Sequence, residues 1–216
     1  MQTRRDVINF IVRSFLFCFT TVGIDFSRVA SAFEGIKKRI VPKGTDPNSL
    51  RNQNPEFLDT RNLQVMPLRE FGTMGDRDAF FDAERWLLEL TGAIQTPLQF
   101  TYDEILKLPV VEREVLLVCP GVFANYGRWK GISMQELVKR VQPGRGVSRV
   151  IIYGRSRVGD RKEIFTIDEV KAGKVFLSYA VNGEILSRDH GFPLRIVAEG
   201  HWGSCWVKYV YKVEFA

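Results

Sequence analysis

Short strand-like runs that alternate with helix-start motifs are the feature that most constrains what this chain can fold into. Apolar strand patterns occupy residues 85–91, 114–118, 149–153, 175–180 and 184–186. Thr101, Ser133 and Thr166 are each followed three residues later by Glu, which is the spacing of a capping box at the start of a helix. Helices this short and irregular do not build a doubly wound sheet, so the sequence predicts an α+β domain that is mostly β.

The C-terminal part of the sequence carries two further strand signals. Asn182-Gly183 separates two of the strand runs and predicts a tight hairpin turn between them. Alternate residues are predicted to share one face of a final strand, namely Val207, Tyr209, Tyr211, Val213 and Phe215. Lys208 falls on the opposite face of that strand, together with Lys212 and Glu214.

Residues 1–32 have the features of an export signal. Thr3-Arg4-Arg5-Asp6 is a twin-arginine start, and residues 14–24 are uncharged but shorter than the roughly 20 apolar residues of a membrane span. Ala30-Ser31-Ala32 supplies a small-residue cleavage pattern. The sequence thus predicts export by the twin-arginine route to the periplasm or the outer face of the cytoplasmic membrane. A retained N-terminal membrane anchor is the alternative.

The rest of the chain divides into a connector and a domain. Residues 33–62 hold several Pro and Asn residues and too few apolar side chains to offset the entropy of ordering, which predicts a linker. Residues 63–216 form the folded domain. The net charge of +6 does not come mainly from this domain, because residues 63–216 carry 21 basic and 19 acidic side chains. Nucleic acid is therefore not an expected partner, since a basic stripe is missing.

Cys119 ends an apolar run within the segment Val115-Leu-Leu-Val-Cys-Pro-Gly121. Such a thiol can pack as a small hydrophobic side chain, form a disulfide with Cys205, or bind a soft metal as a thiolate. The nearby Gly121 and Gly127 leave room for a bulky cofactor, which favours the metal. A zinc site is not expected, because the three Cys and two His residues of the chain lack the usual ligand spacings.

A second group of residues is typical of phosphate binding. It lies in the segment Asp189-His-Gly-Phe-Pro-Leu-Arg195, which glycine and proline shape into a loop. The planar guanidinium of Arg195 matches phosphate oxygens, and His190 can donate another hydrogen bond. Lys208 adds a positive charge from the final strand. The alternative is that Arg195 pairs with Glu199 or with another acid.

The two groups together resemble the sulfite oxidase superfamily over roughly Leu63 to the C-terminus. Residues 182–195 are similar to the superfamily segment N-G-x-x-L-x-x-x-H-G-x-P-x-R, and Glu199–Gly203 and Trp206–Lys208 match the loop and strand downstream of it. The resemblance implies a sulfite-oxidase-type molybdopterin-binding fold with a molybdenum-molybdopterin cofactor, and it makes Cys119 the metal ligand. The cofactor-binding residues that it implies are Arg69, Glu70, Cys119, Gly154, His190, Arg195, Trp206, Val207 and Lys208.

The chain also departs from true sulfite oxidases. Those enzymes follow the cysteine with an arginine-containing stretch, whereas Pro120–Ala124 is uncharged and the next cation is Arg128. The sequence contains no haem-attachment C-x-x-C-H motif, and we expect the protein to lack the immunoglobulin-like dimerisation domain of sulfite oxidases. In these respects the chain resembles single-domain exported members, such as the catalytic subunit of the methionine-sulfoxide reductase system. We expect a monomeric catalytic domain that exchanges electrons with a membrane-linked haem or quinol partner.

The resemblance implies an exported oxidoreductase that carries out two-electron oxygen-atom transfer on a small molecule. Arg69 and Arg128 are the expected catalytic partners of Cys119, because arginine suits the orientation of a polarised oxygen. The neutral residues after Cys119 favour reduction of an S-oxide or N-oxide over sulfite-like oxidation of a small anion. A cation such as Arg69 or Arg155 folded over the metal would restore an anion site. Two other functions stay open, a molybdenum-free binding module stapled by a disulfide and a membrane-tethered electron-transfer subunit.

Overall fold

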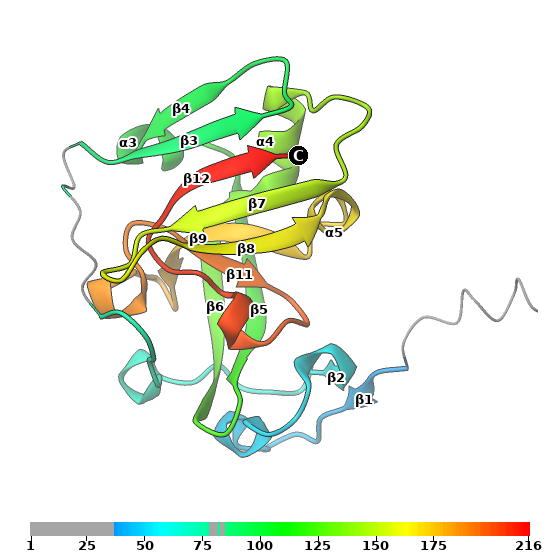
Figure 1. Ribbon diagram of the computed structural model, residues 1–216. Helices are drawn as coiled ribbons and strands as arrows, with labels where there is room; N and C mark the ends of the chain where they lie inside the picture. The colour runs from blue at the N-terminus through cyan, green and yellow to red at the C-terminus, as the bar shows by residue number, and fades with distance from the viewer. Residues whose placement is uncertain (1–36, 78–81, 83–84) are drawn as a thin grey trace, which may run out of the picture. The chain divides into compact units, whose positions relative to one another are not determined.

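The computed structural model describes residues 37–77, 82 and 85–216, so the predicted export signal lies outside the described residues. From Lys38 onward the chain forms one compact unit. Figure 1 shows its two main β-sheets, one above the other, with short helices beside them. This architecture confirms the predicted α+β fold with mostly β structure.

Each main sheet has five strands in the described part of the chain. One sheet has the order β4–β3–β12–β7–β8, and the other has the order β10–β9–β6–β5, with β11 also paired to β9. The strands of the first are β3 (Leu87–Gly92), β4 (Leu98–Thr101), β7 (Arg149–Gly154), β8 (Arg161–Thr166) and β12 (Val210–Phe215). The strands of the second are β5 (Val110–Cys119), β6 (Phe123–Ser133), β9 (Val175–Val181), β10 (Glu184–Ile185) and β11 (Arg195–Ala198).

Short elements connect these strands. The α-helices are α3 (Tyr102–Ile105), α4 (Met134–Val141) and α5 (Ile167–Lys171). Single 3₁₀ turns are η2 (Pro47–Leu50), η3 (Pro55–Phe57), η4 (Leu68–Glu70), η5 (Arg188–His190) and η6 (Gly203–Cys205). A small parallel pair joins β1 (Arg39–Ile40) to β2 (Leu58–Asp59). None of the helices within residues 37–77, 82 and 85–216 has the length and apolar character that a membrane span requires.

The apolar faces of the two sheets enclose the main core. Leu90, Ile152 and Val213 come from the first sheet, and Ile132, Leu177 and Ile196 come from the second; all six are fully or almost fully buried. The α4 and α5 helices close one side of this core, where they pack against each other and against β9. The core fixes the ends of β5 and β11, which carry Cys119 and Arg195.

Two of the three predicted capping boxes are confirmed. Thr101 with Glu104 and Thr166 with Glu169 each form both reciprocal hydrogen bonds. The prediction at Ser133 is wrong in part. Its hydroxyl accepts a hydrogen bond from the Gln135 amide, but Glu136 pairs with Arg140 one turn further along α4 and does not reach back to Ser133.

The predicted hairpin at Asn182-Gly183 is confirmed, and both residues have positive φ angles of 53° and 85°, as this turn requires. The predicted face of the last strand is wrong at Tyr211, and β12 begins at Val210, so the buried Val207 and Tyr209 precede it. A β-bulge lies between Val210 and Lys212, so the strand changes phase there. Val210 is therefore buried in the core, whereas Tyr211 is only partly buried.

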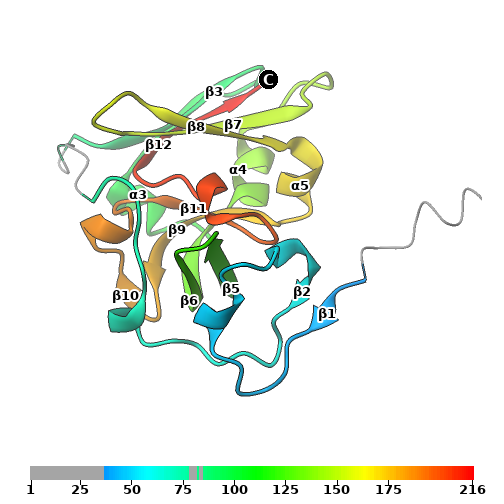
Figure 2. The ribbon, with the colours of Figure 1, turned by 60° about the horizontal axis from the view of Figure 1, so that its bottom comes forward.

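Residues 38–62 differ from the predicted linker, because they pack onto the β5–β6 hairpin (Figure 2). Asp46 and Asn54 cap η2 and η3. A second apolar cluster contains Val41, Leu50 and Leu58 from this part of the chain, the adjacent Leu63, and Leu116, Val118, Ala124 and Tyr126 from the hairpin. The segment has few apolar residues, as the composition indicated, but these residues pack together in one cluster. Its turns also provide hydrogen-bond acceptors for their own backbone amides, so the segment can be ordered.

This packing predicts a clear contrast between two neighbouring residues. Leu58→Ala should lower the free energy of unfolding by about 2–4 kcal/mol, because Leu58 is buried in the second apolar cluster. Phe57→Ala is the matched control, since Phe57 is about half exposed and should change stability by less than about 0.5 kcal/mol. Denaturant titration measures both. Equally small effects would mean that residues 38–62 are only loosely attached to the hairpin.

Candidate functional site

A cavity of about 400 Å³ lies beside the carboxyl end of β5 and the start of β12. It gathers residues that are far apart in the sequence: Gly72–Asp76, Leu117, Cys119, Pro120, Phe123, Asn125, Arg155, Arg161, Arg195, Gly203, Ser204 and Trp206–Tyr209. Five of the residues predicted from the sequence line it, namely Cys119, Arg195, Trp206, Val207 and Lys208. The others, Arg69, Glu70, Arg128, Gly154 and His190, lie outside its lining.

Cys119 is the last residue of β5, and its partner across the hairpin is Phe123. The Cys119 Sγ lies 3.8 Å from the Sδ of Met74. Burial raises the pKa of the Cys119 thiol, so a soft metal would have to displace its proton on binding. Cys119 and Cys205 are both free thiols, so the disulfide that the sequence left open is not formed.

Arg195 begins β11 and is almost completely buried, with 6% of its surface exposed. Its guanidinium carbon lies 5.0 Å from the ring centroid of Trp129 and 5.7 Å from that of Trp206. One nitrogen, Nη1, donates to the carbonyl oxygen of His190 at 3.1 Å. The Nε is buried, and no described residue accepts a hydrogen bond from it. Burial lowers the pKa of Arg195 to about 10, so it keeps its charge at neutral pH.

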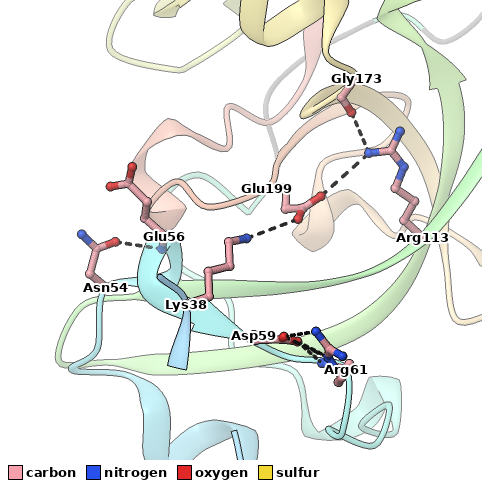
Figure 3. Close-up of polar contacts among 8 residues, drawn as sticks. All are labelled: Lys38, Asn54, Glu56, Asp59, Arg61, Arg113, Gly173 and Glu199. Atoms are coloured by element: carbon pink, nitrogen blue, oxygen red, sulfur yellow. Dashed lines mark hydrogen bonds and ion pairs between the residues drawn. The ribbon is translucent and has the colours of Figure 1, made fainter. Parts of the chain in front are cut away.

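The structure excludes an ion pair between Arg195 and Glu199, which was one of the alternatives for Arg195. Glu199, the acid that the sequence suggested as its partner, instead receives two other cations, as Figure 3 shows. Lys38 Nζ lies 3.7 Å from Glu199 Oε1, and Arg113 Nη1 lies 3.8 Å from Glu199 Oε2. Arg113 also donates to the carbonyl oxygen of Gly173 at 2.7 Å. The buried guanidinium of Arg195 is therefore not paired with Glu199.

Lys208, which is half-buried, supplies a second positive charge to the cavity. Its ammonium donates to the backbone carbonyl oxygens of Asp189, at 2.9 Å, and of Asp76. Burial, followed by the charge of Arg195, lowers the pKa of Lys208 to about 8. Gly191 has a φ of 100°, and a Cβ there would lie 2.9 Å from the side chain of Lys208. The glycine thus permits the close approach of the η5 loop to Lys208.

His190 and Gly154 contribute to the site through their backbone atoms and not through side chains that line the cavity. His190 is half-buried on η5, and its carbonyl oxygen holds Arg195 while its ring packs edge-on against Phe71. Burial, and then the charges of Arg195 and Lys208, lower the pKa of His190. A Cβ on Gly154 would lie 2.1 Å from the carbonyl oxygen of Lys208, so Gly154 allows β7 to pass directly beside the cavity wall.

The geometry does not fit the predicted catalytic roles of two arginines. Arg69 lies on η4 with 81% of its side chain exposed, and it pairs with Glu70 at 3.5 Å. Arg128 pairs with Glu114 at 2.7 Å. Since side chains alternate along β6, Arg128 projects from the face opposite to that of Phe123 and Asn125, which line the cavity. Neither Arg69 nor Arg128 lines the cavity beside the Cys119 thiol.

Several lining residues were not identified as site residues from the sequence. Asn125 could have been found, because it lies on the same face of the β5–β6 hairpin as Cys119. Gly72–Asp76 arrives through an irregular segment that has no sequence signal. Arg161, the first residue of β8, is brought to the cavity only by the tertiary fold. Arg155, which follows β7 and was considered from the sequence as a cation near the metal, also lines the cavity.

The charges of the lining favour an anionic ligand. Arg155, Arg161, Arg195 and Lys208 are the basic residues that line it, and Asp76 is the only acidic lining residue in the described part of the chain. A phosphate group carries about −1.5 to −2 charge at neutral pH, and its oxygens suit an unsatisfied guanidinium donor. A group with a phosphate at one end and a soft metal at the other therefore fits Arg195, Lys208 and Cys119 together.

The comparisons with known proteins identify the family of the chain. Residues 75–216, well over half of the chain, match the family described as the oxidoreductase molybdopterin binding domain. A nitrate reductase (NADH) of Brassica napus is 29% identical over 205 residues, covering 79% of this chain and 22% of that protein. Nitrate reductase (NADH) 1 of Arabidopsis thaliana is 29% identical over 160 residues, covering 59% and 17%. This chain thus spans about a fifth of the length of these relatives.

The fold is also known from a solved structure. The sulfane dehydrogenase SoxCD from Paracoccus pantotrophus superimposes with a TM-score of 0.60 at 17% identity, covering 87% of this chain and 52% of that chain. At this identity the likeness supports the fold, while the match over residues 75–216 supports the family. The chain belongs to the oxidoreductase molybdopterin-binding domain family of the sulfite oxidase superfamily, whose cofactor is molybdenum-molybdopterin.

Proposed function

We propose that this chain is the catalytic domain of a molybdenum-molybdopterin oxidoreductase that performs two-electron oxygen-atom transfer on a small substrate. One observation carries the proposal: a single cavity joins a strand-end thiol, Cys119, to a buried guanidinium, Arg195, whose Nε lacks an acceptor among the described residues. The cofactor would unite the two, with Cys119 as the metal ligand and Arg195 and Lys208 as the phosphate ligands. When bound, it supplies two-electron redox chemistry that amino-acid side chains lack.

The residues around the thiol support a neutral, polarised oxide as the substrate. Leu117, Pro120, Phe123 and Met74 form the lining near Cys119 and carry no charge. A charged substrate would lose hydration in such surroundings without receiving a compensating ion pair. We therefore propose reduction of an S-oxide or N-oxide, which consumes two electrons and two protons and releases water. A haem or quinol-linked partner would supply the electrons to a monomeric domain.

A second candidate is the oxidation of a small anion, and Arg161 is the observation that favours it. Arg161 lines the cavity and donates to the backbone carbonyl oxygen of Ser204 at 3.4 Å. Arg155 offers less, since it pairs with Asp160 at 3.8 Å and stacks on Tyr211, with its guanidinium carbon 4.0 Å from the ring centroid. An oxyanion could replace the weak backbone contact of Arg161 with a charge-assisted one.

We also propose that the chain is exported. The support is the twin-arginine start at Arg4-Arg5 and the small-residue pattern at Ala30-Ser31-Ala32. An enzyme that binds its cofactor inside a closed fold suits a route that exports folded proteins. The proposed location is the periplasm or the outer face of the cytoplasmic membrane.

Steady-state assays decide between the two substrate classes. With a reduced dye as donor, S-oxides should turn over at least tenfold faster, in kcat/KM, than sulfite does with an artificial acceptor. Arg161→Ala should change S-oxide reduction little, and Arg149→Ala, at an exposed position on β7, is the matched control. Efficient sulfite oxidation that is lost in Arg161→Ala and kept in Arg149→Ala would establish the second candidate instead.

The metal content of two cysteine variants tests the assigned ligand. The purified chain should hold about one molybdenum, and Cys119→Ser should lose activity and most of the metal, because a hydroxyl is a poor ligand for a soft metal. Cys205→Ser should keep the metal, since Cys205 is a free thiol outside the cavity lining. Elemental analysis gives both values. Retention of molybdenum in Cys119→Ser would refute the assignment.

Cell fractionation tests export. Arg4→Lys combined with Arg5→Lys should leave the chain in the cytoplasm, because the twin-arginine receptor reads the pair, whereas Arg13→Lys should be exported normally. Unchanged export of the double variant would show that another route is used.

A further inference from the structure

We infer that Met74, held in place by Asn125, is a gate over the thiol end of the cavity and determines the size and polarity of what reaches it. This inference rests on the proposed function, because it names the residue that selects among substrates at that site. Three sets of contacts in the Gly72–Asp76 segment support it.

The first observation is the position of Met74. Its Sδ lies 3.8 Å from the Sγ of Cys119, and 50% of the residue surface is exposed. An apolar side chain that contacts the thiol on one side and solvent on the other lies at the opening of the cavity. Met74 also lines the cavity together with Phe123 and Pro120. A substrate that reaches the thiol end from the side of Met74 therefore contacts this side chain.

The second observation is a pair of hydrogen bonds that fixes the backbone beside Met74. The Gly72 amide donates to Asn125 Oδ1 at 3.0 Å, and Asn125 Nδ2 donates to the Gly72 carbonyl oxygen at 2.8 Å. Asn125 is a buried polar residue, with only 3% of its surface exposed. Its amide thus pairs with Gly72 as a neighbouring strand would, and this contact anchors the segment to β6.

The fit at this anchor is tight. A Cβ on Gly72 would lie 2.4 Å from the ring of Phe123, so only glycine allows the segment to approach β6 so closely. The Phe123 ring and the Asn125 side-chain amide together therefore fix the position of the Gly72 backbone. Because Met74 follows two residues later, this anchor holds the Met74 backbone near the Cys119 end of the cavity, where its Sδ lies 3.8 Å from the thiol sulfur.

The third observation is an anchor at the other end of the segment. The Asp76 carbonyl oxygen accepts hydrogen bonds from the Tyr209 hydroxyl, at 2.8 Å, and from the Lys208 ammonium. Between the two anchors, the Thr73 hydroxyl donates to the carbonyl oxygen of Asp189 at 2.9 Å. With the backbone held on both sides, the Met74 side chain is the part of this segment that can move.

Methionine suits such a gate. Its unbranched thioether has three rotatable bonds and is polarisable, so it can move aside for an organic sulfide or sulfoxide and pack against it. A hydrated anion gains nothing from this contact and loses solvation there. The gate therefore favours small, uncharged sulfur compounds and discriminates against bulky ones.

The first experiment measures discrimination in the full-length, molybdenum-loaded protein. The probes are dimethyl sulfoxide and methyl p-tolyl sulfoxide, and the quantity is the ratio of their kcat/KM values. Met74→Ala should raise the ratio of bulky to small substrate about tenfold, mainly through KM, because space is opened at the gate. Met74→Leu conserves volume and should keep the wild-type ratio. Val122→Ala, exposed on the same hairpin but outside the cavity lining, is the matched control.

A second measurement does not depend on turnover. In full-length protein produced without molybdate, mass spectrometry follows alkylation of Cys119 by iodoacetamide. Met74→Ala and Asn125→Ala should both speed this reaction several-fold over wild type and over Met74→Leu. The Asn125→Ala variant tests whether the placement of Met74 matters, because it keeps the methionine side chain and removes only the hydrogen bonds that anchor its segment. Far-ultraviolet circular dichroism checks that each variant is folded.

The outcomes separate this inference from the proposed function. If no sulfoxide is reduced by any variant, the proposed function fails and the alkylation rates alone decide the gate. If Met74→Ala changes neither the substrate ratio nor the alkylation rate, Met74 is not a gate. If Met74→Ala speeds alkylation while Asn125→Ala does not, Met74 covers the thiol but Asn125 does not position it, and the inference as stated is overturned.

Discussion

The buried guanidinium of Arg195 is the constraint on which the rest of this site depends. A charge that is taken out of water without a counter-ion is costly, and here the nearest acid along the chain, Glu199, is bound to Lys38 and Arg113 instead. The rings of Trp129 and Trp206 pack around the guanidinium, but the Nε still lacks an acceptor among the described residues. The fold thus holds a positive charge that an anion could neutralise, and we propose that the phosphate of the family's cofactor is this anion.

The β5–β6 hairpin connects this charge to the rest of the molecule. One of its faces carries Cys119, Asn125 and Trp129, which contribute the thiol, the anchor for Gly72 and one wall around Arg195. The other face carries the apolar residues that residues 38–62 cover. A single antiparallel pair therefore supports the site on one side and the N-terminal packing on the other, since side chains alternate along each strand.

The sequence allowed good predictions where the signal was local. Cys119 ends an apolar run and Arg195 follows a Gly/Pro loop, and both line the cavity. Predictions failed where the outcome depended on register or on packing. Arg128 was a reasonable catalytic candidate because it lies only nine residues after Cys119. Side chains alternate along β6, however, so Arg128 projects from the face opposite to Phe123 and pairs with Glu114. The Gly72–Asp76 segment has no periodic pattern in the sequence, and tertiary contacts such as the paired hydrogen bonds of Asn125 bring it to the cavity.

The most direct test of the central claim is the cofactor content of Arg195 variants, measured as molybdenum and pterin per chain. Arg195→Ala should lose most of the cofactor while circular dichroism shows a retained fold, because the charge-assisted contact to the phosphate is gone. Arg195→Lys should keep an intermediate amount, since it restores the charge but not the planar fork. Full occupancy in Arg195→Ala would contradict the account and would make Arg195 a purely structural residue.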